Sequence, residues 1–330
     1  MSLELAAWAV FVAFILVMLA LDLFVLHRDA HEVSMGEAAA WSALWIALAL
    51  GFGGVLWAFK GGTAAGEYLA GYLIEKSLSV DNIFVFVLIF SFFSVPKAYQ
   101  HRVLIWGVLG ALLMRAVFIF AGAALLDAFH WVLYLFGAFL VFTGFKMFRH
   151  QDLALHPSEN RVLRLVQRFI PLTTEYHGQR LFIRQDGVLA ATPLFAVLVV
   201  VETTDLIFAV DSIPAIFAVT RDPFIVFTSN VFAILGLRSL YFLLAGVAHR
   251  FVYLKVGLAA ILILVGTKML VADLYKVPVG LSLGLIGAIL TGSIVASLWS
   301  KRRVDEPHEV AVPDPFGLIT GEGHREDKQR

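Results

Sequence analysis

Three carboxylate side chains stand within one strongly apolar stretch, VETTDLIFAVDSIPAIFAV at residues 201–219. They belong to Glu202, Asp205 and Asp211. A charge at the centre of a membrane-spanning helix costs about 2.5 to 3.5 kcal/mol on insertion scales. A spanning helix with three such charges is stable only where they face protein, water, a counter-ion or a metal. The stretch therefore predicts a functional site for cations.

Helical spacing places two of these acids together and separates the third. Glu202 and Asp205 are three residues apart and share a face, whereas Asp211 points about 120° away in a straight helix. Pro214 has no N–H to donate to the carbonyl of Val210, so it is a candidate for a helix break. Such a break would free a backbone oxygen and swing Asp211 toward the other acids.

A second apolar stretch with charged members is YLIEKSLSVDNIF at residues 72–84. Its candidate site residues are Glu75, Lys76, Asp81 and Asn82. Helical geometry places Glu75, Ser79 and Asn82 on one face. The two stretches together provide the carboxylates of a cation pathway.

The ligands available to a metal here are mainly oxygen atoms. The chain contains no cysteine, and none of its ten histidines falls clearly within a predicted span. Hydroxyl and amide groups accompany the acids at Asn82, Thr203, Thr204, Ser212 and Asn230. Hard ions such as Mg²⁺, Mn²⁺ or Ca²⁺ fit this set better than Zn²⁺, Cu or Ni²⁺, and ligand type does not choose among the three hard ions.

The composition is that of a membrane protein. Of the 330 residues, 60% are hydrophobic and only 15% are charged, a balance that favours many membrane-spanning helices. Nine apolar runs are long enough to span a bilayer, near residues 5–26, 38–59, 68–93, 103–126, 131–148, 191–219, 224–247, 254–272 and 279–299. We expect an all-α polytopic membrane protein with one transmembrane domain over residues 1–300, and a polar, disordered tail over 301–330.

The positive charges are unevenly distributed between the predicted loops. Loops on one side hold most of the lysines and arginines, including those of the long segment 149–190, whereas the other side holds only Lys60, Arg221 and Lys276. The positive-inside rule then predicts an amino terminus outside, a carboxyl terminus inside and a cytoplasmic loop over residues 149–190. Within that loop, RQDGV at 184–188 predicts a turn.

Three landmarks recur along the chain in the same order. DNIF at 81–84 matches DLIF at 205–208, LMRAVFIFAG around Arg115 matches GLRSLYFLLAG around Arg238, and TGFKM at 143–147 matches VGTKM at 265–269. The offsets are 124, 123 and 122 residues, which indicates that the third to fifth spans are repeated as the sixth to eighth. Because each copy has three spans, the second is inverted in the membrane, an arrangement typical of transporters with a site near the midplane.

The remaining polar residues in the apolar runs have two interpretations each. Arg115 and Arg238 are counter-charges or gates, or they form structural salt bridges that fix two helices, and the salt bridge is favoured. Asp22 is an extra ligand or an interfacial acid. We assign five candidates to the transport pathway or its gating: Asp22, Lys76, Arg115, Asn230 and Arg238.

These motifs resemble a known family. GYLIEKSLSVDNIFVF, FGAFLVFTGFKMF, LILVGTKML and above all DSIPAIFAVTRDPFIVFTSNVFAILGLR closely resemble the TerC family of integral membrane proteins, named for tellurium resistance, and especially its Alx branch. The resemblance extends from the first span to about residue 298. It implies manganese export across the bacterial inner membrane through an ion pathway of Glu75, Asp81, Asn82, Glu202, Asp205 and Asp211.

We therefore expect a Mn²⁺ exporter driven by an ion gradient, with carboxylates that alternate between metal and protons. No nucleotide-binding or catalytic motif is found, so neither direct ATP coupling nor an enzyme is expected. The alternative is a non-transporting membrane partner protein that supports metalation or stress resistance, and a passive channel is a third interpretation. The expected partners are Mn²⁺, protons and the lipid bilayer, without nucleic acid or a permanently bound cofactor. A homo-oligomer is left open.

Overall fold

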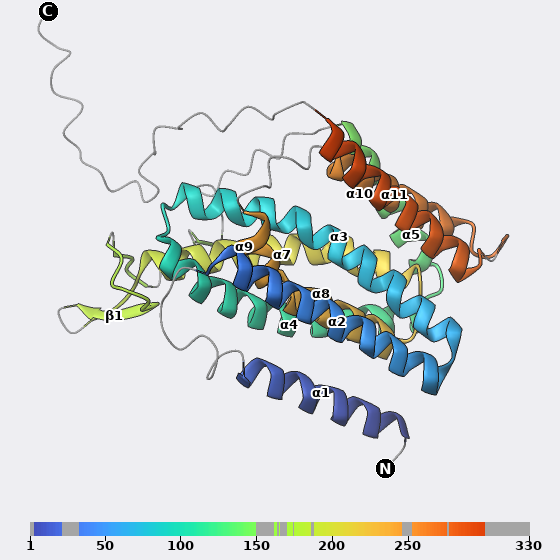
Figure 1. Ribbon diagram of the computed structural model, residues 1–330, viewed down its shortest axis with the longest axis horizontal. Coiled ribbons are helices and arrows are strands. Elements are labelled where there is room, and N and C mark those ends of the chain that lie inside the picture. Colours follow the sequence, from blue (N-terminus) through green and yellow to red (C-terminus); the bar gives the residue numbers. More distant parts are fainter. Residues whose placement is uncertain are drawn as a thin grey trace, which may run out of the picture.

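The computed structural model of this chain describes residues 3–21, 33–149, 162, 163, 165, 170–173, 175–185, 188–245, 253–275 and 277–300. In this part of the chain, long helices run side by side as a bundle (Figure 1). The predicted tail and Asp22 lie outside the described residues, as does the side chain of Asp81. The all-α fold class is confirmed, with one small hairpin of strands added to it.

The helices follow the apolar runs of the sequence. They are α1 (Leu3–Leu21), α2 (Met35–Lys60), α3 (Gly62–Phe92), α4 (Lys97–Ala128), α5 (Val132–Arg149), α7 (Pro193–Phe217), α8 (Pro223–Leu235), α9 (Leu237–Leu244), α10 (Leu254–Leu270) and α11 (Val279–Trp299). Six helices in the described ranges are long and apolar enough to cross a membrane, with α8 and α9 counted as one. Among the remaining helices, α3 carries several charges along its 31 residues, yet half of its described side chains are buried within the bundle and few are exposed.

Local sequence signals set the helix boundaries. Gly61 separates α2 from α3 with a φ of 88°, a left-handed conformation that glycine adopts without steric cost. At the start of α8, the Oδ1 atom of Asp222 accepts a hydrogen bond from the N–H of Phe224 at 2.9 Å, and Pro223 occupies the first helical position. These signals fix tight connections at the same end of the bundle.

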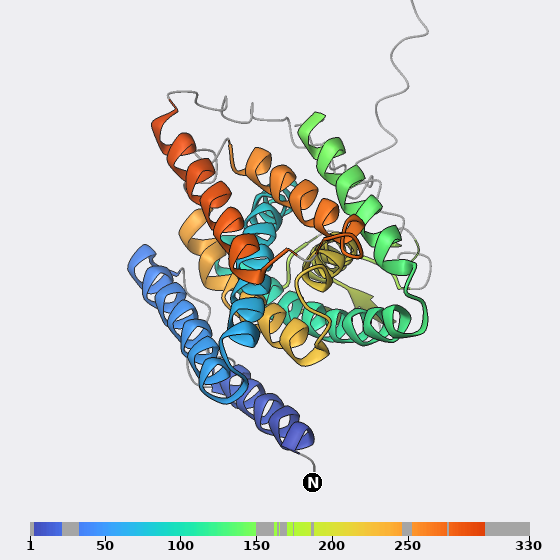
Figure 2. The ribbon, with the colours of Figure 1, turned by 90° about the vertical axis from the view of Figure 1, so that its right-hand side faces the viewer.

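The helix pair α3 and α7 lies at the centre. In the view along the bundle, α5, α10 and α11 lie on one side and α1 and α2 on the opposite side (Figure 2). The helix α3 packs against α7, α8 and α2, while α4 packs against α7 and α8. The acidic stretches of the sequence lie on α3 and α7, so the core of the protein is also where its buried charges are found.

Helices α5 and α10 are antiparallel and in close contact. A Cβ atom added to Gly266 would lie 2.7 Å from the carbonyl oxygen of Gly137, and one added to Gly144 would lie 2.9 Å from that of Ala259. Such distances leave no room for a side chain, so glycine at 144 and 266 permits the two backbones to approach. This close approach joins the side of the bundle formed by α5, α10 and α11.

The helix break considered at Pro214 does not occur. Helix α7 continues through Pro214 and ends at Phe217, and the N–H of Ala218 donates to the carbonyl of Pro214 at 3.0 Å. Because the proline lies in the last turn, its missing N–H removes one hydrogen bond near a helix end that already lacks partners. Asp211 is therefore not swung toward the other acids.

The segment before α7 contains an antiparallel hairpin of β1 (Phe182–Gln185) and β2 (Val188–Ala191). Gln185 pairs with Val188, so the two strands meet at the position of the predicted turn, whose central residues 186 and 187 lie outside the described residues. The hairpin and the amino terminus lie at opposite ends of the bundle (Figure 1). The described residues of the predicted cytoplasmic loop therefore lie at one end of the helices.

Candidate functional site

A buried ion cluster joins the three helices at the centre of the bundle. Arg115 of α4 lies between Glu75 of α3 and Asp205 of α7, and the three residues are 1%, 0% and 3% exposed. The Nη1 atom of Arg115 donates to Glu75 Oε1 and, at 3.1 Å, to Ser212 Oγ. Its Nε and Nη2 atoms donate to the two oxygens of Asp205 at 3.3 and 3.2 Å. The guanidinium thus forms a bidentate pair with one carboxylate and a second pair with another.

Asn82 extends this cluster along α3. Its Nδ2 atom donates to Asp205 Oδ1 at 3.4 Å. Ser79, one turn earlier, is buried together with Glu75 and Asn82, so the face predicted for these three residues points into the protein. Glu75 Oε2, Ser79 Oγ and Asn82 Oδ1 have no hydrogen-bond partner among the described residues. Buried oxygens of this kind are ready acceptors for a proton donor or a cation.

The fully ionised cluster carries one negative charge in excess. Glu75 and Asp205 each contribute one negative charge and Arg115 one positive charge. A charge left uncompensated in a low-dielectric interior is costly, and the cost falls when a counter-ion or proton joins the group. The cluster is therefore electrostatically suited to take up a further cation.

Glu202 lies one helical turn before Asp205 and packs against α4. A Cβ atom added to Gly110 would collide with the Glu202 carboxylate, so only glycine at position 110 leaves space for it. Glu202 Oε2 has no hydrogen-bond partner within the described part of the chain. The predicted common face of Glu202 and Asp205 thus meets α4, where Gly110 and Arg115 lie.

Arg238 is the counterpart of Arg115 in the second copy of the predicted repeat, and it lies near Asp205. It borders a cavity of about 10 Å³ together with Asp205, Gly107, Val201 and Phe86. A volume of this size holds about one water molecule. Arg238 is 6% exposed. Both predicted arginines therefore lie near Asp205, one as its direct ion partner and one across a small cavity.

Asp211 lies apart from the cluster. Its Oδ1 atom accepts a hydrogen bond from Thr143 of α5 at 3.4 Å, and Lys146 lies close enough to attract its charge. The convergence of Asp211 with Glu202 and Asp205 is therefore wrong, because a continuous α7 keeps Asp211 on the side that faces α5.

Lys76 of α3 contacts α8, and Asn230 is a buried residue of α8. Lys76 Nζ donates to the carbonyl of Ala233 at 3.4 Å. A Cβ atom added to Gly236 would lie 2.6 Å from the same Nζ atom. Asn230 is 1% exposed, and neither polar atom of its amide finds a hydrogen-bond partner in the described ranges. These residues line a second polar region beside α8.

Some residues of the site were missed by sequence reasoning. Gly110 carries no chemistry of its own, so nothing in the sequence pointed to it. Thr143 is one neutral hydroxyl among many. Glu67 of α3, which accepts a hydrogen bond from Thr220 Oγ1 at 2.6 Å, could have been found as an acid near the start of the third apolar run. Such contacts connect residues that are far apart in the sequence.

The described residues contain no group of three or more acidic or histidine side chains arranged to hold a metal. Two carboxylates surround a guanidinium instead. Metal binding by Glu75 and Asp205 therefore requires that Arg115 release at least one of them. The site is therefore an ion cluster in which a positive side chain lies between two carboxylates.

This fold and this site define an all-α polytopic membrane protein with a buried ion cluster at its centre. The chain belongs to the TerC family: the family model, described as integral membrane protein TerC family, matches residues 60–305. No solved structure matches the chain.

Curated relatives cover most of the chain. It is 56% identical over 297 residues to the "Uncharacterized membrane protein STKORF319" of Myxococcus xanthus, with 90% of this chain and 93% of the relative covered. It is 49% identical over 308 residues to the "Putative membrane-bound redox modulator Alx" of Salmonella typhi, with 91% and 96% covered. The protein of the same name from Escherichia coli (strain K12) is 48% identical over 309 residues, again with 91% and 96% covered. The resemblance to the family and to its Alx branch is thereby confirmed.

Proposed function

We propose that this protein exports divalent cations, Mn²⁺ foremost, in exchange for protons or another ion. The observation that carries the proposal is the Arg115 guanidinium held between two carboxylates on separate helices, Glu75 and Asp205, in the centre of a membrane bundle. Ionisable groups inside a membrane mark ion pathways in many transporters. Oxygen ligands of this type suit hard divalent ions.

Arg115 acts in this proposal as a resident counter-charge. When no metal is bound, it neutralises one of the two carboxylates and keeps the cluster assembled. An arriving divalent cation takes its place between Glu75 and Asp205, and Asn82 and Ser212 offer further oxygen ligands. After the metal leaves, Arg115 returns to one carboxylate and a proton neutralises the other, so that metal and proton use the same groups in turn.

We further propose nine membrane spans that contain an inverted repeat of α3–α5 and α7–α10. Exchange of the two copies turns the contact of α3 with α8 into the contact of α7 with α4, and both contacts are extensive. The contact of Gly144 with Ala259 becomes that of Gly266 with Gly137, at the same offset of 122 residues found in the sequence. Antiparallel α5 and α10 fit copies of opposite orientation.

The proposed orientation follows the charge of the two ends. The end with the β hairpin carries Lys97, Arg149 and Lys255, and the opposite end carries the Lys60 and Asp222 pair. The positive-inside rule assigns the hairpin end to the cytoplasm of a bacterial inner membrane, with the amino terminus outside. The cluster then lies between the two faces of the membrane. We propose that the ion pathway includes three further carboxylates, those of Asp81, Glu202 and Asp211.

The test is Mn²⁺ flux into proteoliposomes with and without a pH gradient. Wild-type protein is expected to move Mn²⁺ in a gradient-dependent way, and Glu75→Gln and Asp205→Asn are expected to abolish this flux. Asp222→Asn, which removes a carboxylate charge outside the cluster and keeps the helix cap, is the matched control and should transport normally. Mn²⁺ flux that is unchanged in both cluster variants would overturn the proposal.

The names of several relatives favour a second candidate function, modulation of redox state in the membrane. This chain contains no cysteine, so such a role would act through an ion or through another protein. The same proteoliposomes separate the two candidates. A folded wild-type protein that moves no cation would favour the second candidate, in the form of a non-transporting membrane partner that supports metalation or stress resistance.

A further inference from the structure

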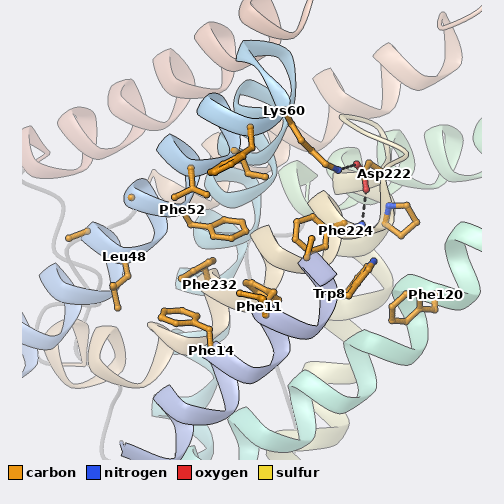
Figure 3. Close-up of a pocket in the computed structure, with 18 residues that line it drawn as sticks. Trp8, Phe11, Phe14, Leu48, Phe52, Lys60, Phe120, Asp222, Phe224 and Phe232 are labelled. Atoms are coloured by element: carbon orange, nitrogen blue, oxygen red, sulfur yellow. Dashed lines mark hydrogen bonds and ion pairs between the residues drawn. The ribbon is translucent and has the colours of Figure 1, made fainter. Parts of the chain in front are cut away.

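A large apolar groove lies between α1 and the rest of the bundle, and none of its lining residues belongs to the ion cluster. Its volume is about 1000 Å³, and its walls come from α1, α2, α4 and α8 (Figure 3). Aromatic rings dominate the lining, with Trp8 and Phe11 of α1 facing Phe52 of α2 and Phe224 of α8. A volume at the upper end of the range of small-molecule sites, about 300 to 1000 Å³, accommodates a long hydrocarbon chain.

The groove is polar at one end only. There, Lys60 Nζ and Asp222 Oδ2 form an ion pair at 2.8 Å, with side chains 39% and 35% exposed (Figure 3). The second oxygen of Asp222 caps α8, which fixes the position of the carboxylate. Lys60 also lies over the ring of Phe224, 5.3 Å from its centroid. A positive and a negative group are therefore held together at the mouth of an apolar groove.

The groove is long enough to extend through one leaflet of a membrane. Its lining on α2 extends from Ala47 to Lys60, which at 1.5 Å per residue is about 20 Å. The hydrocarbon layer of a bilayer is about 30 Å thick, so one leaflet contributes about half of that. An occupant with a charged head at Lys60 and an apolar chain directed toward the membrane midplane fills such a groove.

We propose that this groove binds a phospholipid with a zwitterionic head group that contains a phosphate and a primary ammonium. The phosphate contacts Lys60, the ammonium contacts Asp222, and one acyl chain lies along the aromatic rings of α1 and α2. The four charges then alternate in sign, which opens the existing ion pair without leaving either side chain unpaired. An anionic lipid has no positive group to offer Asp222. This inference does not depend on ion transport by the central cluster.

Two glycines of α2 provide a matched pair of variants for the test. Gly51 lines the groove and Gly54 does not, and a Cβ atom at either position would meet no atom within 4 Å. Gly51→Leu therefore adds an apolar side chain at the wall of the groove, with free space at its Cβ atom, and Gly54→Leu adds the same side chain at a position that does not line the groove. Each methylene kept out of an apolar site lowers affinity about fourfold, so displacement of two lowers it about fifteenfold.

The experiment is native mass spectrometry of the full chain in detergent, titrated separately with phosphatidylethanolamine and with phosphatidylglycerol of the same acyl chains. We expect one tightly bound phosphatidylethanolamine in the wild type, a loss of affinity of about fifteenfold in Gly51→Leu, and wild-type binding in Gly54→Leu. Asp222→Asn should remove the preference over phosphatidylglycerol, and Lys60→Gln should weaken the binding of both lipids, because both carry the phosphate. Arg221→Gln, whose side chain does not line the groove, should keep the wild-type affinity and preference.

Three results would overturn the proposal. Equal binding to Gly51→Leu and Gly54→Leu would mean that the lipid binds elsewhere. A preference for phosphatidylglycerol in the wild type would refute the zwitterionic head group. A dimer that forms in the wild type and disappears in Gly51→Leu would mean that a second copy of the chain occupies the groove.

Discussion

The replacement of Arg115 by methionine tests the ion cluster most directly. Methionine is unbranched and uncharged and is shorter than arginine, so Arg115→Met keeps an apolar side chain in the site and removes the positive group between Glu75 and Asp205. The two carboxylates then lie in a buried site without their counter-charge. The variant asks whether a metal ion replaces the guanidinium.

The magnitude follows from the burial of the pairs. Removal of one partner from a buried ion pair costs about 3 to 5 kcal/mol. At about 2 to 4 °C for each kcal/mol in a protein of 150 to 250 residues, the lower figure corresponds to a fall of about 6 to 12 °C in Tm. A ligand at one hundred times its Kd returns about 2.7 kcal/mol. Saturating Mn²⁺ should therefore restore most of the stability that Arg115→Met loses.

The assay is the Tm of the protein in detergent, measured with and without Mn²⁺. Arg115→Met should melt lower than wild type and gain more from Mn²⁺ than wild type does, because no guanidinium competes with the metal. The double variant Arg115→Met with Asp205→Asn is the control, since it removes one charge of each sign. It should regain part of the stability and lose the response to Mn²⁺.

Two outcomes would refute this reasoning. A wild-type Tm for Arg115→Met would mean that the arginine does not stabilise the two acids. An equal response to Mn²⁺ in the single and the double variant would mean that the metal binds at another site. If the single variant does not fold, addition of Mn²⁺ during purification provides the second measurement, and failure of Mn²⁺ to rescue it would count against the metal site.

Three further predictions concern other parts of the structure. Gly110→Ala should reduce Mn²⁺ flux at least tenfold with little loss of folded protein, because the added Cβ displaces the Glu202 carboxylate; equal flux in the variant and the wild type would contradict the role of Glu202. Gly266→Ala should lower the free energy of unfolding by about 1 to 3 kcal/mol through overpacking against Gly137, whereas Gly287→Ala on α11, where a Cβ meets nothing within 4 Å, should not; thermal melting measures both. Burial raises the pKa of Tyr176 to about 12. The buried neutral phenol should therefore contribute fully to stability below pH 10, and this contribution should be lost as the pH rises toward 12. The alkaline loss of stability should be smaller in Tyr176→Phe, and an unchanged pH profile of stability in this variant would exclude Tyr176 as the source of the loss.

Much of the fold could be predicted from the sequence because its signals are local. Apolar runs of spanning length became helices, and Asp222, Pro223 and Gly61 set boundaries where such residues are expected. Pro214 shows the limit of such signals. Pro214 removes one hydrogen bond, but α7 ends three residues later at Phe217, so the loss falls in the last turn and does not break the helix.

The candidate site was predicted less completely, since its geometry depends on contacts between helices. The buried face of Glu75, Ser79 and Asn82 followed from helical periodicity alone. The partner of Asp205 did not, because helical spacing says nothing about which side chain of a neighbouring helix faces it. The favoured interpretation, that Arg115 forms a salt bridge, is confirmed. Only the structure shows that Arg115 pairs with two carboxylates at once.

The sequence by itself determined that this chain is an all-α membrane protein of the TerC family with acids, arginines and oxygen ligands in its spans, since composition and spacing are properties of the chain. The tertiary structure alone decided that Arg115 holds Glu75 and Asp205 together, that Asp211 faces α5, and that Gly110 leaves space for Glu202. These arrangements depend on how the helices pack against one another. A buried charge takes the partner that the neighbouring helix brings within reach, and that partner lies 40 residues from Arg115 at Glu75 and 90 residues away at Asp205.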